Sequence, residues 1–395
     1  MKNTLAVWTA GQRSGIIEQD EEYVFNYLPD VSDRYAVSLT MPVRLQSWTH
    51  KTLHPVFQMN LPEGALLAAI KNALAKIARV DDLTLLSVVG TNQIGRNRFT
   101  LTEEQSPAFK LSPESLEDIL HYPDTGELFN ELLQKYAMHS GISGIQPKVL
   151  LDAKDRATVH VLSYIVKSWG SDYPYLAANE YFCMKAVRRA GLPTPENFLS
   201  DNGKLFVMKR FDMTDAGEYV GFEDMCALQG LGTEDKYTGS YERVVRTIND
   251  YVSPRYRQIA REQFFAALAL TVMLRNGDAH LKNFGVLYAD PTRGGTKLAP
   301  VYDIVTTTAY ISRDVPALTI GGTKKWWDRK TLEKFATAHC GLSASRAAEL
   351  ISESGDAVQD IKPELKRYIK DHSEFSPVGK GMLKAWEEGV KSLLP

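Results

Sequence analysis

Cysteine is scarce in this sequence. The three cysteines, Cys183, Cys226 and Cys340, lie far apart and form no CxxC pair. This distribution excludes a zinc ribbon, a thioredoxin-type motif and a dense disulfide framework, and it is typical of proteins that work in a reducing compartment. We therefore expect a cytoplasmic protein.

Long apolar runs are also missing. The longest apolar segment, residues 264–274, is interrupted by Thr271. It is well short of the roughly 20 residues that a membrane crossing requires. The start of the sequence contains only a few consecutive apolar side chains, too few for the core of a signal peptide. We expect no membrane association and no export signal.

Neither sign of charge dominates. The 46 lysines and arginines are balanced by 48 aspartates and glutamates, so the net charge of −2 provides no field that attracts nucleic acid or an anionic membrane. With 44% hydrophobic and 24% charged residues, the chain can bury a core, and extended disorder is not expected. Its 395 residues are enough for two or three domains, or for a two-lobed unit with an added module.

Residue patterns divide the chain into three regions. Residues 1–110 are predicted to form a mixed α+β module, with strands at residues 5–8 and 23–27 and a helix at residues 62–77. Residues 102–124, rich in Glu, Ser and Pro, are predicted to be a linker.

The second region, residues 125–220, is predicted to be a sheet with one helix, and the third, residues 221–395, to be mainly helical. We expect strands at residues 148–152, 159–167 and 205–209, and helices at residues 176–190, 259–274, 332–338 and 347–351. The expected fold class is therefore α+β. A small β-rich lobe followed by a larger helical lobe is the arrangement of protein kinases.

The most informative stretch is the loop after the apolar helix, RNGDAHLKNF at residues 275–284. Asp278 and Asn283 have the D-x-x-x-x-N spacing of a kinase catalytic loop, in which the aspartate accepts the proton of the substrate hydroxyl and the asparagine coordinates magnesium. His280, between them, is a further candidate. The ordinary alternative is a helix end closed by Gly277, with a polar turn after it.

A second acidic residue follows at the distance where kinases carry their metal-binding aspartate. Asp303 stands twenty residues after Asn283. Mg²⁺ prefers oxygen ligands and keeps several waters, so one carboxylate and one amide oxygen suffice beside phosphate groups. Asn283 and Asp303 are therefore the predicted metal ligands. The alternative for Asp303 is an aspartate that caps a turn or a helix.

A glycine-containing loop and a lysine are candidates for contacts with nucleotide phosphates. In SGISGIQPK, residues 140–148, Gly141 and Gly144 allow backbone N–H groups to converge on an anion, with an empty glycine hairpin as the alternative. Lys167 ends an apolar strand after this loop, as does the kinase lysine that contacts the phosphates, and Glu180 could hold it by an ion pair. Otherwise Lys167 is a solvated lysine at a strand end.

The segment FVMKRFD, residues 206–212, ends the β-rich region at the place of the hinge between kinase lobes. Backbone groups near Lys209 and Phe211 could bind an adenine edge there. An ordinary buried strand explains the pattern equally well.

Taken in order, several segments of the sequence resemble the HipA-like serine/threonine kinases, which are toxins of HipBA-type toxin–antitoxin systems. The segments are ISGIQPKVLL, YIVKSW, NEYFCMKAVRRAGL, VMKRFD, NGDAHLKNFG and YDIV. They lie within about residues 138–312, and NxDAHxKNF is a highly specific signature. The segment NLPEG, residues 60–64, resembles the N-terminal subdomain that accompanies the kinase core in full-length HipA proteins.

The resemblance implies a bilobal kinase-like fold, with a mixed α/β N-terminal region, an all-α C-terminal lobe and ATP between them. It also implies that Asp278 is the catalytic base, with His280 beside it, and that Asn283 and Asp303 hold Mg²⁺. The residues implied to contact ATP are Gly141, Ser143, Gly144, Lys148, Lys167, Lys209 and Phe211.

Known members of this family phosphorylate aminoacyl-tRNA synthetases, which halts charging and growth, and they are held in check by a helix-turn-helix antitoxin. For this chain the resemblance implies a HipB-like antitoxin as a partner and a protein substrate such as an aminoacyl-tRNA synthetase. Contact with DNA is expected mainly through the antitoxin complex.

Members of the family also autophosphorylate a serine in the glycine loop, which shuts the kinase down. The best-known HipA toxins carry this serine three positions before the loop glycine, where this chain has Gly141. The short HipT relatives have an SIS motif whose second serine matches Ser143. Ser143 is therefore the predicted autophosphorylation site, with Ser140 as the second choice.

The sequence thus predicts an ATP- and Mg²⁺-dependent protein serine/threonine kinase that acts as a growth-inhibiting toxin. Two other functions fit the same residues. A kinase for small-molecule hydroxyls would share the Asp–Asn–Asp set, and a nucleotide-binding pseudokinase would only dock an antitoxin and DNA.

Overall fold

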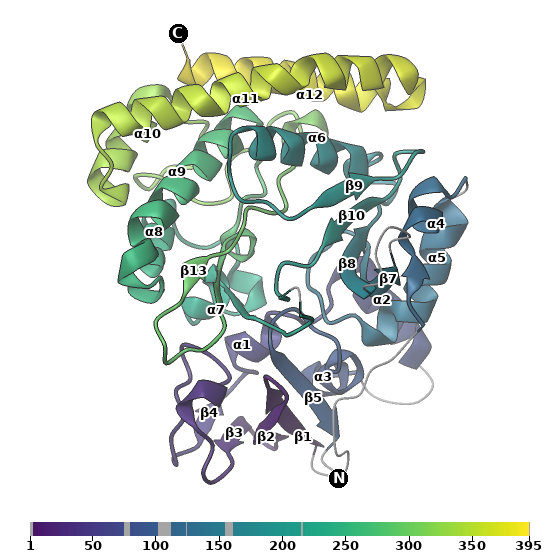
Figure 1. Cartoon of the computed structure of the whole chain (residues 1–395), viewed down its shortest axis with the longest axis vertical. Coiled ribbons are helices and arrows are strands. Elements are labelled where there is room, and N and C mark those ends of the chain that lie inside the picture. The colour runs from purple at the N-terminus through teal and green to yellow at the C-terminus, as the bar shows by residue number, and fades with distance from the viewer. Residues whose placement is uncertain are drawn as a thin grey trace. The chain divides into compact units, whose positions relative to one another are not determined.

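The computed structural model describes residues 3–74, 80–101, 112–123, 125–154, 161–214 and 216–394. The chain divides into two compact units, and Figure 1 labels the elements of both. Unit 1 comprises Met1–Ser168, Ser200–Asp235 and Gly285–Thr296, and unit 2 comprises Trp169–Leu199, Lys236–Phe284 and Lys297–Pro395. The division into three regions expected from the sequence is finer than this one and stays a prediction.

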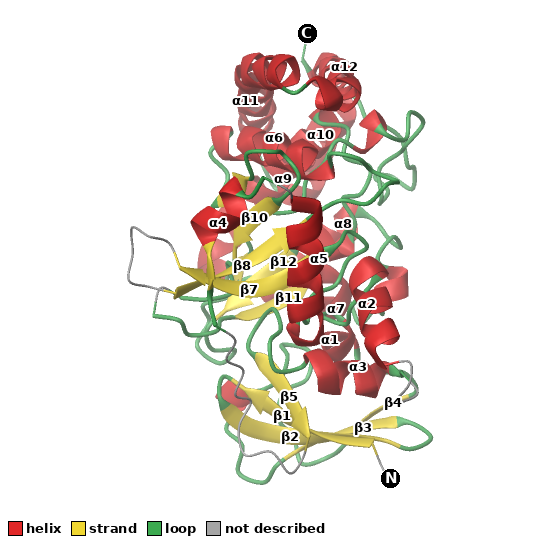
Figure 2. Cartoon of the chain, turned by 90° about the vertical axis from the view of Figure 1, so that its right-hand side faces the viewer, coloured by secondary structure: helices red, strands yellow, loops and turns green. Residues whose placement is uncertain are grey.

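Unit 1 begins with an antiparallel sheet, whose strands are drawn in yellow in Figure 2 and follow the order β4-β3-β2-β1-β5. The strands are β1 (Asn3–Thr9), β2 (Gln12–Gln19), β3 (Tyr23–Tyr27), β4 (Trp48–His50) and β5 (Asn97–Leu101). Ala10 and Gly11, with φ of 49° and 79°, join β1 to β2 in a turn whose positive φ angles match the twist of a hairpin. The strands predicted at residues 5–8 and 23–27 are confirmed.

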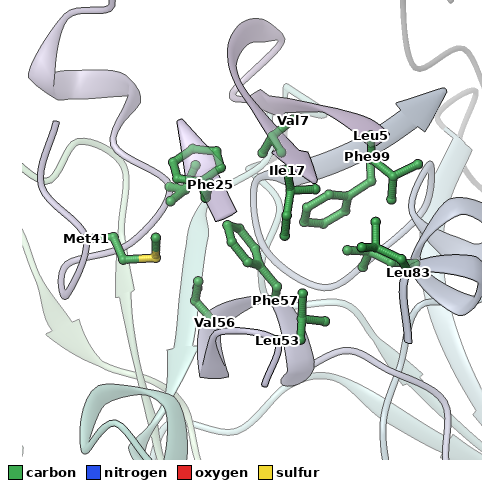
Figure 3. Packing of buried hydrophobic residues seen from close by; sticks show 12 residues of the cluster. Leu5, Val7, Ile17, Phe25, Met41, Leu53, Val56, Phe57, Leu83 and Phe99 are labelled. Carbon is green, nitrogen blue, oxygen red and sulfur yellow. The ribbon is translucent and has the colours of Figure 1, made fainter. Parts of the chain in front are cut away.

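The core of this sheet is packed on one face. Leu5 and Val7 of β1 and Phe25 of β3 are buried there, because side chains two positions apart on a strand point to the same side. Three helices lie between β4 and β5 in the sequence, namely α1 (Pro55–Gln58), α2 (Gly64–Leu74) and α3 (Asp82–Val89). Figure 3 shows Phe57 of α1 against the rings of Phe25 and Phe99, at centroid distances of 5.4 and 5.6 Å. The helix predicted at residues 62–77 is present as α2, and residues 75–77 lie outside the described residues.

A second sheet in unit 1 has the order β6-β7-β8-β10. Its strands are β6 (Glu114–Ser115), β7 (Lys148–Lys154), β8 (Val161–Lys167) and β10 (Phe206–Lys209). The helices beside it are α4 (Leu116–His121) and α5 (Thr125–Tyr136), and α5 packs against β7. The predicted strands at residues 148–152, 159–167 and 205–209 are confirmed where they are described.

The prediction of a linker at residues 102–124 is wrong for residues 114–121, which form β6 and α4. Ser115 ends β6 and caps α4 by accepting a hydrogen bond from the N–H of Asp118 (3.2 Å), while Leu116 and Ile119 are buried. A stretch rich in Ser and acidic residues is also what begins a capped helix, so composition alone misled the prediction. Residues 102–111 and 124 lie outside the described residues.

Two further strands of unit 1, β11 (Gly221–Asp224) and β12 (Gly285–Tyr288), pair in antiparallel fashion, and α7 (Met225–Leu228) follows β11. The carboxyl group of Glu223 is buried between them and the N-terminal module. It accepts hydrogen bonds from Ser38 Oγ (2.6 Å), the N–H of Leu39 (2.8 Å) and the hydroxyl of Tyr288 (2.6 Å). Burial raises the pKa of Glu223.

A buried ion pair makes a second connection within unit 1. Arg210 Nη2 lies 2.7 Å from Asp212 Oδ2, and both side chains are almost fully buried. Arg210 also donates to Asn92 Oδ1 (2.9 Å) and Gln93 O (2.6 Å), and Asp212 accepts the N–H of Gly95 (2.6 Å). Because buried charges persist only when they are paired and hydrogen bonded, this set ties the end of β10 to the loop before β5.

Unit 2 is mainly helical. Its helices are α6 (Leu176–Arg189), α8 (Tyr241–Tyr251), α9 (Arg257–Met273), α10 (Arg329–Phe335), α11 (Ala344–Asp371) and α12 (Ser376–Leu393), and its short strands are β9 (Asn197–Leu199) and β13 (Lys297–Leu298). The four helices predicted for these stretches are confirmed, α11 being much longer than expected. Among the helices that the structure describes, none has the length and apolarity to cross a membrane.

The core helix of unit 2 is α9, which is buried along residues 263–273. α11 packs on α9 and lies beside α12 (Figure 1). A Cβ added at Gly389 of α12 would lie 2.7 Å from the carbonyl carbon of Met273, so only glycine lets α12 approach the end of α9 this closely. α12 therefore supports the point at which α9 gives way to the predicted catalytic loop.

Candidate active site

The loop at residues 275–284 follows α9 directly and is anchored to it. The N–H of Asn276 donates to Thr271 O (2.9 Å) in the last turn of the helix. Asn276 Oδ1 in turn accepts the N–H of Asp278 (3.1 Å). Asp278 therefore sits on a turn that the buried helix holds in place.

A second segment of unit 2 supports the same loop from the other side. The N–H of Gly277 donates to Thr307 Oγ1 (2.7 Å). Thr307 also bonds to Arg275 O through its N–H (3.2 Å) and its hydroxyl (3.1 Å). A Cβ at Gly277 would lie 2.5 Å from Cγ of Asp314, so the absence of a side chain at Gly277 lets the carboxylate of Asp314 pack closely against the loop. The alternative suggested by the sequence, a helix end closed by Gly277, is wrong. Helix α9 ends at Met273, and Arg275, with φ of 56°, takes the left-handed conformation that closes it.

The side chain of Asn283 connects the backbones of the other two predicted oxygen-bearing residues. Asn283, in the short helix Leu281–Asn283, donates from Nδ2 to the carbonyl oxygens of Asp278 (3.2 Å) and Asp303 (3.1 Å). Asp303 has φ of 61°, an uncommon conformation for a residue other than glycine, and such outliers gather at functional sites. One amide group therefore joins two backbone positions that are distant in the sequence.

The amide oxygen of Asn283 is the atom that points to a metal. It is buried and has no hydrogen-bond partner among the described residues. A buried acceptor without a partner is costly, and a cation would satisfy it. Amide and carboxylate oxygens are the ligands that Mg²⁺ prefers, so Asn283 and Asp303 fit this ion.

The electrostatics of Asp278 are those of a proton acceptor near neutral pH. Burial raises its pKa to about 6, the hydrogen bond from the Tyr237 hydroxyl opposes the rise, and the nearby Asp303 carboxylate adds to it. At pH 7 the carboxylate is therefore mostly ionised and still basic enough to take a proton.

His280 shares the loop but not this chemistry. Burial, with Lys236 adding to the effect, lowers the pKa of His280 to about 4, so its ring is neutral at pH 7. Its Nδ1 has no hydrogen-bond partner among the described residues, and its ring lies 5.0 Å from that of Tyr237. The structure thus gives His280 a packing contact, and the catalytic role predicted for it stays a prediction.

The predicted phosphate loop lies in unit 1, and the backbone of its first part is hydrogen bonded to the N-terminal module. The N–H of Gly141 donates to Asn92 O (2.8 Å), and Gly141 O accepts the N–H of Ile94 (3.3 Å). Ser140 is fully buried, donates to Tyr136 O (2.8 Å) and accepts from the N–H of Leu150. Gly141 and Ser140 therefore anchor the loop to the rest of unit 1, and this structural role explains why these two residues are found here.

The second part of the loop contains Gly144 and Ser143, the predicted autophosphorylation site. The hydroxyl of Ser143 donates to the carboxylate of Glu63, which precedes α2. Gly144 has φ of 123°, which only glycine adopts easily, and a Cβ there would lie 2.5 Å from Lys148 Nζ. The ammonium group of Lys148 therefore lies directly beside the loop backbone. Ile145, the next residue, is exposed and contacts Gly64.

Two lysines face each other at the start of this sheet. Lys148 of β7 and Lys167 of β8 are register partners, and their exposures are only 6% and 3%. Like charges at opposite positions of neighbouring strands repel each other. The roles predicted for Lys148 and Lys167 in contacting ATP stay predictions. The predicted ion pair between Lys167 and Glu180 joins residues of different units and stays a prediction.

The residues of the predicted hinge make structural contacts within unit 1. Lys209 pairs with Tyr164 at the end of β10, and Phe211 packs its ring 5.5 Å from that of Phe222. Between them, Arg210 holds the buried ion pair with Asp212 described above. Adenine binding at Lys209 and Phe211 stays a prediction.

Sequence reasoning missed several residues that contact the site. Tyr237 and Thr307 contact the predicted catalytic loop, Asp314 packs against it, and Glu63 contacts Ser143. Glu63 was noted only as part of the NLPEG resemblance, and the other three had no local signal because each reaches its partner from a distant stretch.

Two family models match the chain. Residues 140–361, more than half of the chain, match the HipA-like C-terminal domain. The protein belongs to the HipA family. Residues 5–100 also match the HipA N-terminal domain, so the resemblance noted for NLPEG is confirmed together with that of the kinase core.

The fold of this HipA family member agrees with that of a solved relative. HipA of the Shewanella oneidensis MR-1 toxin–antitoxin system was solved in complex with HipB and its operator DNA. It matches 98% of this chain and 97% of its own, with a TM-score of 0.72 and 17% identity. The predicted α+β, HipA-type fold is therefore confirmed.

Two curated relatives carry the name of a kinase. A "Putative kinase" of Haemophilus influenzae is 31% identical over 43% of this chain and 53% of its own length. "Putative kinase Y4dM" of Sinorhizobium fredii is 30% identical over 49% of this chain and 48% of its own length. The chain thus spans about half the length of these relatives.

Proposed function

We propose that this HipA family member is an ATP- and Mg²⁺-dependent protein serine/threonine kinase that acts in the cytoplasm as a growth-inhibiting toxin. The observation that carries the proposal is the amide of Asn283. Its nitrogen draws the backbones of Asp278 and Asp303 together, and its buried oxygen is left without a hydrogen-bond partner among the described residues. A base and two oxygen ligands in one place are what phosphoryl transfer needs.

Asp278 is the proposed catalytic base. The oxygen of the substrate hydroxyl forms a bond to the γ-phosphorus of ATP, and the bond from that phosphorus to the β–γ bridging oxygen breaks. The proton of the hydroxyl passes to the carboxylate of Asp278, whose raised pKa suits it to this step.

Asn283 and Asp303 are the proposed ligands of Mg²⁺, which when bound neutralises charge on the phosphates. Lys148 and Lys167 supply two further positive charges from neighbouring strands. Gly144, which has no side chain, leaves the loop backbone open to the phosphates beside Lys148.

Ser143 is the proposed site of autophosphorylation. It is partly exposed and its hydroxyl binds Glu63, whereas the hydroxyl of Ser140 is buried and makes two hydrogen bonds. A phosphate on Ser143 would face the carboxylate of Glu63, and the repulsion would displace this part of the loop. Modification would in this way switch the kinase off.

A helix-turn-helix antitoxin of the HipB type is the proposed partner, with DNA bound mainly through the antitoxin complex. The support is that HipA of Shewanella oneidensis MR-1 was solved with HipB and operator DNA. A component of translation, such as an aminoacyl-tRNA synthetase, is the proposed substrate. Its identity rests on the family resemblance alone.

The decisive experiment uses purified protein with radiolabelled ATP, alone and with cell extract. Asp278→Asn removes the base with almost no change in shape, and Asp356→Asn, on the exposed face of α11, is the matched control. We expect labelled protein bands with the wild type and the control and none with Asp278→Asn. A small-molecule kinase would leave all protein bands unlabelled. In cells that express either protein, a pseudokinase would arrest growth equally as the wild type and as Asp278→Asn.

A further inference from the structure

The side chain of Asp278 has a partner that the mechanism above does not use. Among the described residues, its carboxylate makes one hydrogen bond, in which the hydroxyl of Tyr237 donates to Oδ1 over 2.7 Å. Tyr237 is 40% exposed and comes from a stretch before α8, well ahead of the catalytic loop in the sequence. The second carboxylate oxygen, Oδ2, is left for another donor.

Tyr237 is held in a fixed position relative to the catalytic loop. Lys236 O accepts the N–H of Leu281 (3.0 Å), which joins the two stretches by their backbones. Lys324 Nζ donates to Tyr237 O (3.2 Å) from a third stretch. The ring of Tyr237 meets that of His280 edge to face, with centroids 5.0 Å apart and an interplanar angle of 79°. The neutral imidazole ring of His280 therefore packs against the phenol ring of Tyr237 and limits its movement.

We propose that Tyr237 is a positioning residue for the catalytic base, an inference that rests on the proposed kinase function. Its hydroxyl fixes Oδ1 and thereby directs Oδ2 of Asp278 toward the substrate hydroxyl. The substrate proton moves to Oδ2 as the new oxygen–phosphorus bond forms and the bond to the β–γ bridging oxygen breaks. The phenol keeps its own proton throughout, because phenols are far weaker acids than carboxylic acids.

A carboxylate can accept both hydroxyls at once. It has two oxygens and about four lone-pair sites, so a phenol on Oδ1 does not block a substrate hydroxyl on Oδ2. Without the phenol, the carboxylate of Asp278 could rotate about its last bond. Effective proton transfer requires the base within hydrogen-bond reach of the substrate, so a rotated base would slow the reaction without weakening ATP binding.

The test compares two variants that each lose one phenolic oxygen. Tyr237→Phe removes the hydrogen bond to Asp278. Tyr175→Phe removes a bond of the same kind, from a tyrosine hydroxyl to the carboxylate of Glu374 (3.0 Å), away from the loop. The full-length protein is used, and the kcat of phosphoryl transfer and the KM for ATP are measured with radiolabelled ATP. Thermal unfolding confirms that both variants are folded.

We expect Tyr237→Phe to lower kcat by about 10- to 100-fold and to change the KM for ATP by less than about twofold. Tyr175→Phe should match the wild type. An unchanged kcat in Tyr237→Phe would overturn the positioning role, and so would a raised kcat, since the phenol would then be blocking the substrate's place. A wild-type protein that transfers no phosphate would overturn the proposed kinase function itself, a result distinct from the other two.

Discussion

Replacing Gly277 with alanine tests how tightly the catalytic loop must pack. The added Cβ would lie 2.5 Å from Cγ of Asp314, whereas carbon atoms in contact are separated by about 3.5 Å or more. The loop and the Asp314 side chain must together give way by about 1 Å. A shift of this size at a reacting group can cost about 100-fold in rate, and the Asp314 carboxylate, at the end of a side chain that can turn aside, takes up part of it. We therefore expect the rate of phosphoryl transfer in Gly277→Ala to fall by about 10-fold, which is about 1.4 kcal/mol of activation free energy.

Two controls separate the clash from a general effect of alanine. Gly170→Ala adds a methyl group where nothing lies within 4 Å, so it should match the wild type. In Gly277→Ala combined with Asp314→Ala, the clashing side chain is gone, and the rate should return to that of Asp314→Ala alone. The measurement is the transfer of label from ATP, with thermal unfolding as a check on folding. A single Gly277→Ala variant that is fully active, or a double variant that is not rescued, would refute this account of the loop.

Three further predictions concern the metal, the loop serine and a buried histidine. Asn283→Ala removes one proposed oxygen ligand of Mg²⁺. In thermal unfolding followed by scanning calorimetry, Mg²⁺ with a nucleotide should therefore raise the Tm of this variant far less than that of the wild type. Equal Tm shifts would contradict the metal role. Glu63→Gln leaves the hydroxyl of Ser143 with a neutral acceptor in place of a charged one, a loss of about 1 kcal/mol, and phosphorylation of Ser143 followed by mass spectrometry should be about fivefold faster. A rate that is unchanged or slower would argue against this contact. Burial lowers the pKa of His54 from an ordinary value of 6.5 to about 4, so between these pH values the unfolded chain binds a proton that the folded protein does not. His54 therefore costs no stability above pH 6.5, and stability is lost as the pH falls from 6.5 toward 4. Denaturation by urea should show a loss of about 3 kcal/mol over this range in the wild type and a clearly smaller loss in His54→Asn.

The contacts within unit 1 give the N-terminal module a structural role beside the predicted phosphate loop. Gly141 is bonded on both sides by the loop before β5, and Ser143 is bonded by Glu63. A Cβ at Gly64 would lie 2.8 Å from Cα of Ile145, so the start of α2 also lies against the phosphate loop. The module thus touches the loop at three successive places. Any change that loosens the module is expected to loosen the loop.

The sequence by itself determined the elements whose signal is local. The strands at residues 5–8 and 23–27 and the buried helix α9 were predictable, because side-chain periodicity depends only on neighbours along the chain. The spacing of Asp278 and Asn283 likewise predicted that the two lie close together, since a loop after a rigid helix carries its geometry within a few residues. Asp303, twenty residues after Asn283, joins them through its backbone oxygen, and the roles of base and metal ligands stay proposals.

Only the tertiary structure decided which residues support that set. Tyr237 reaches Asp278 across 41 positions of sequence, and Glu63 reaches Ser143 across 80. Neither pairing leaves a mark in the local pattern, because a hydrogen bond between distant stretches requires only that the folded chain bring one donor and one acceptor together. The same reason explains the hydrogen bonds of Gly141 to the loop before β5, which the sequence did not predict, while its contact with ATP stays a prediction.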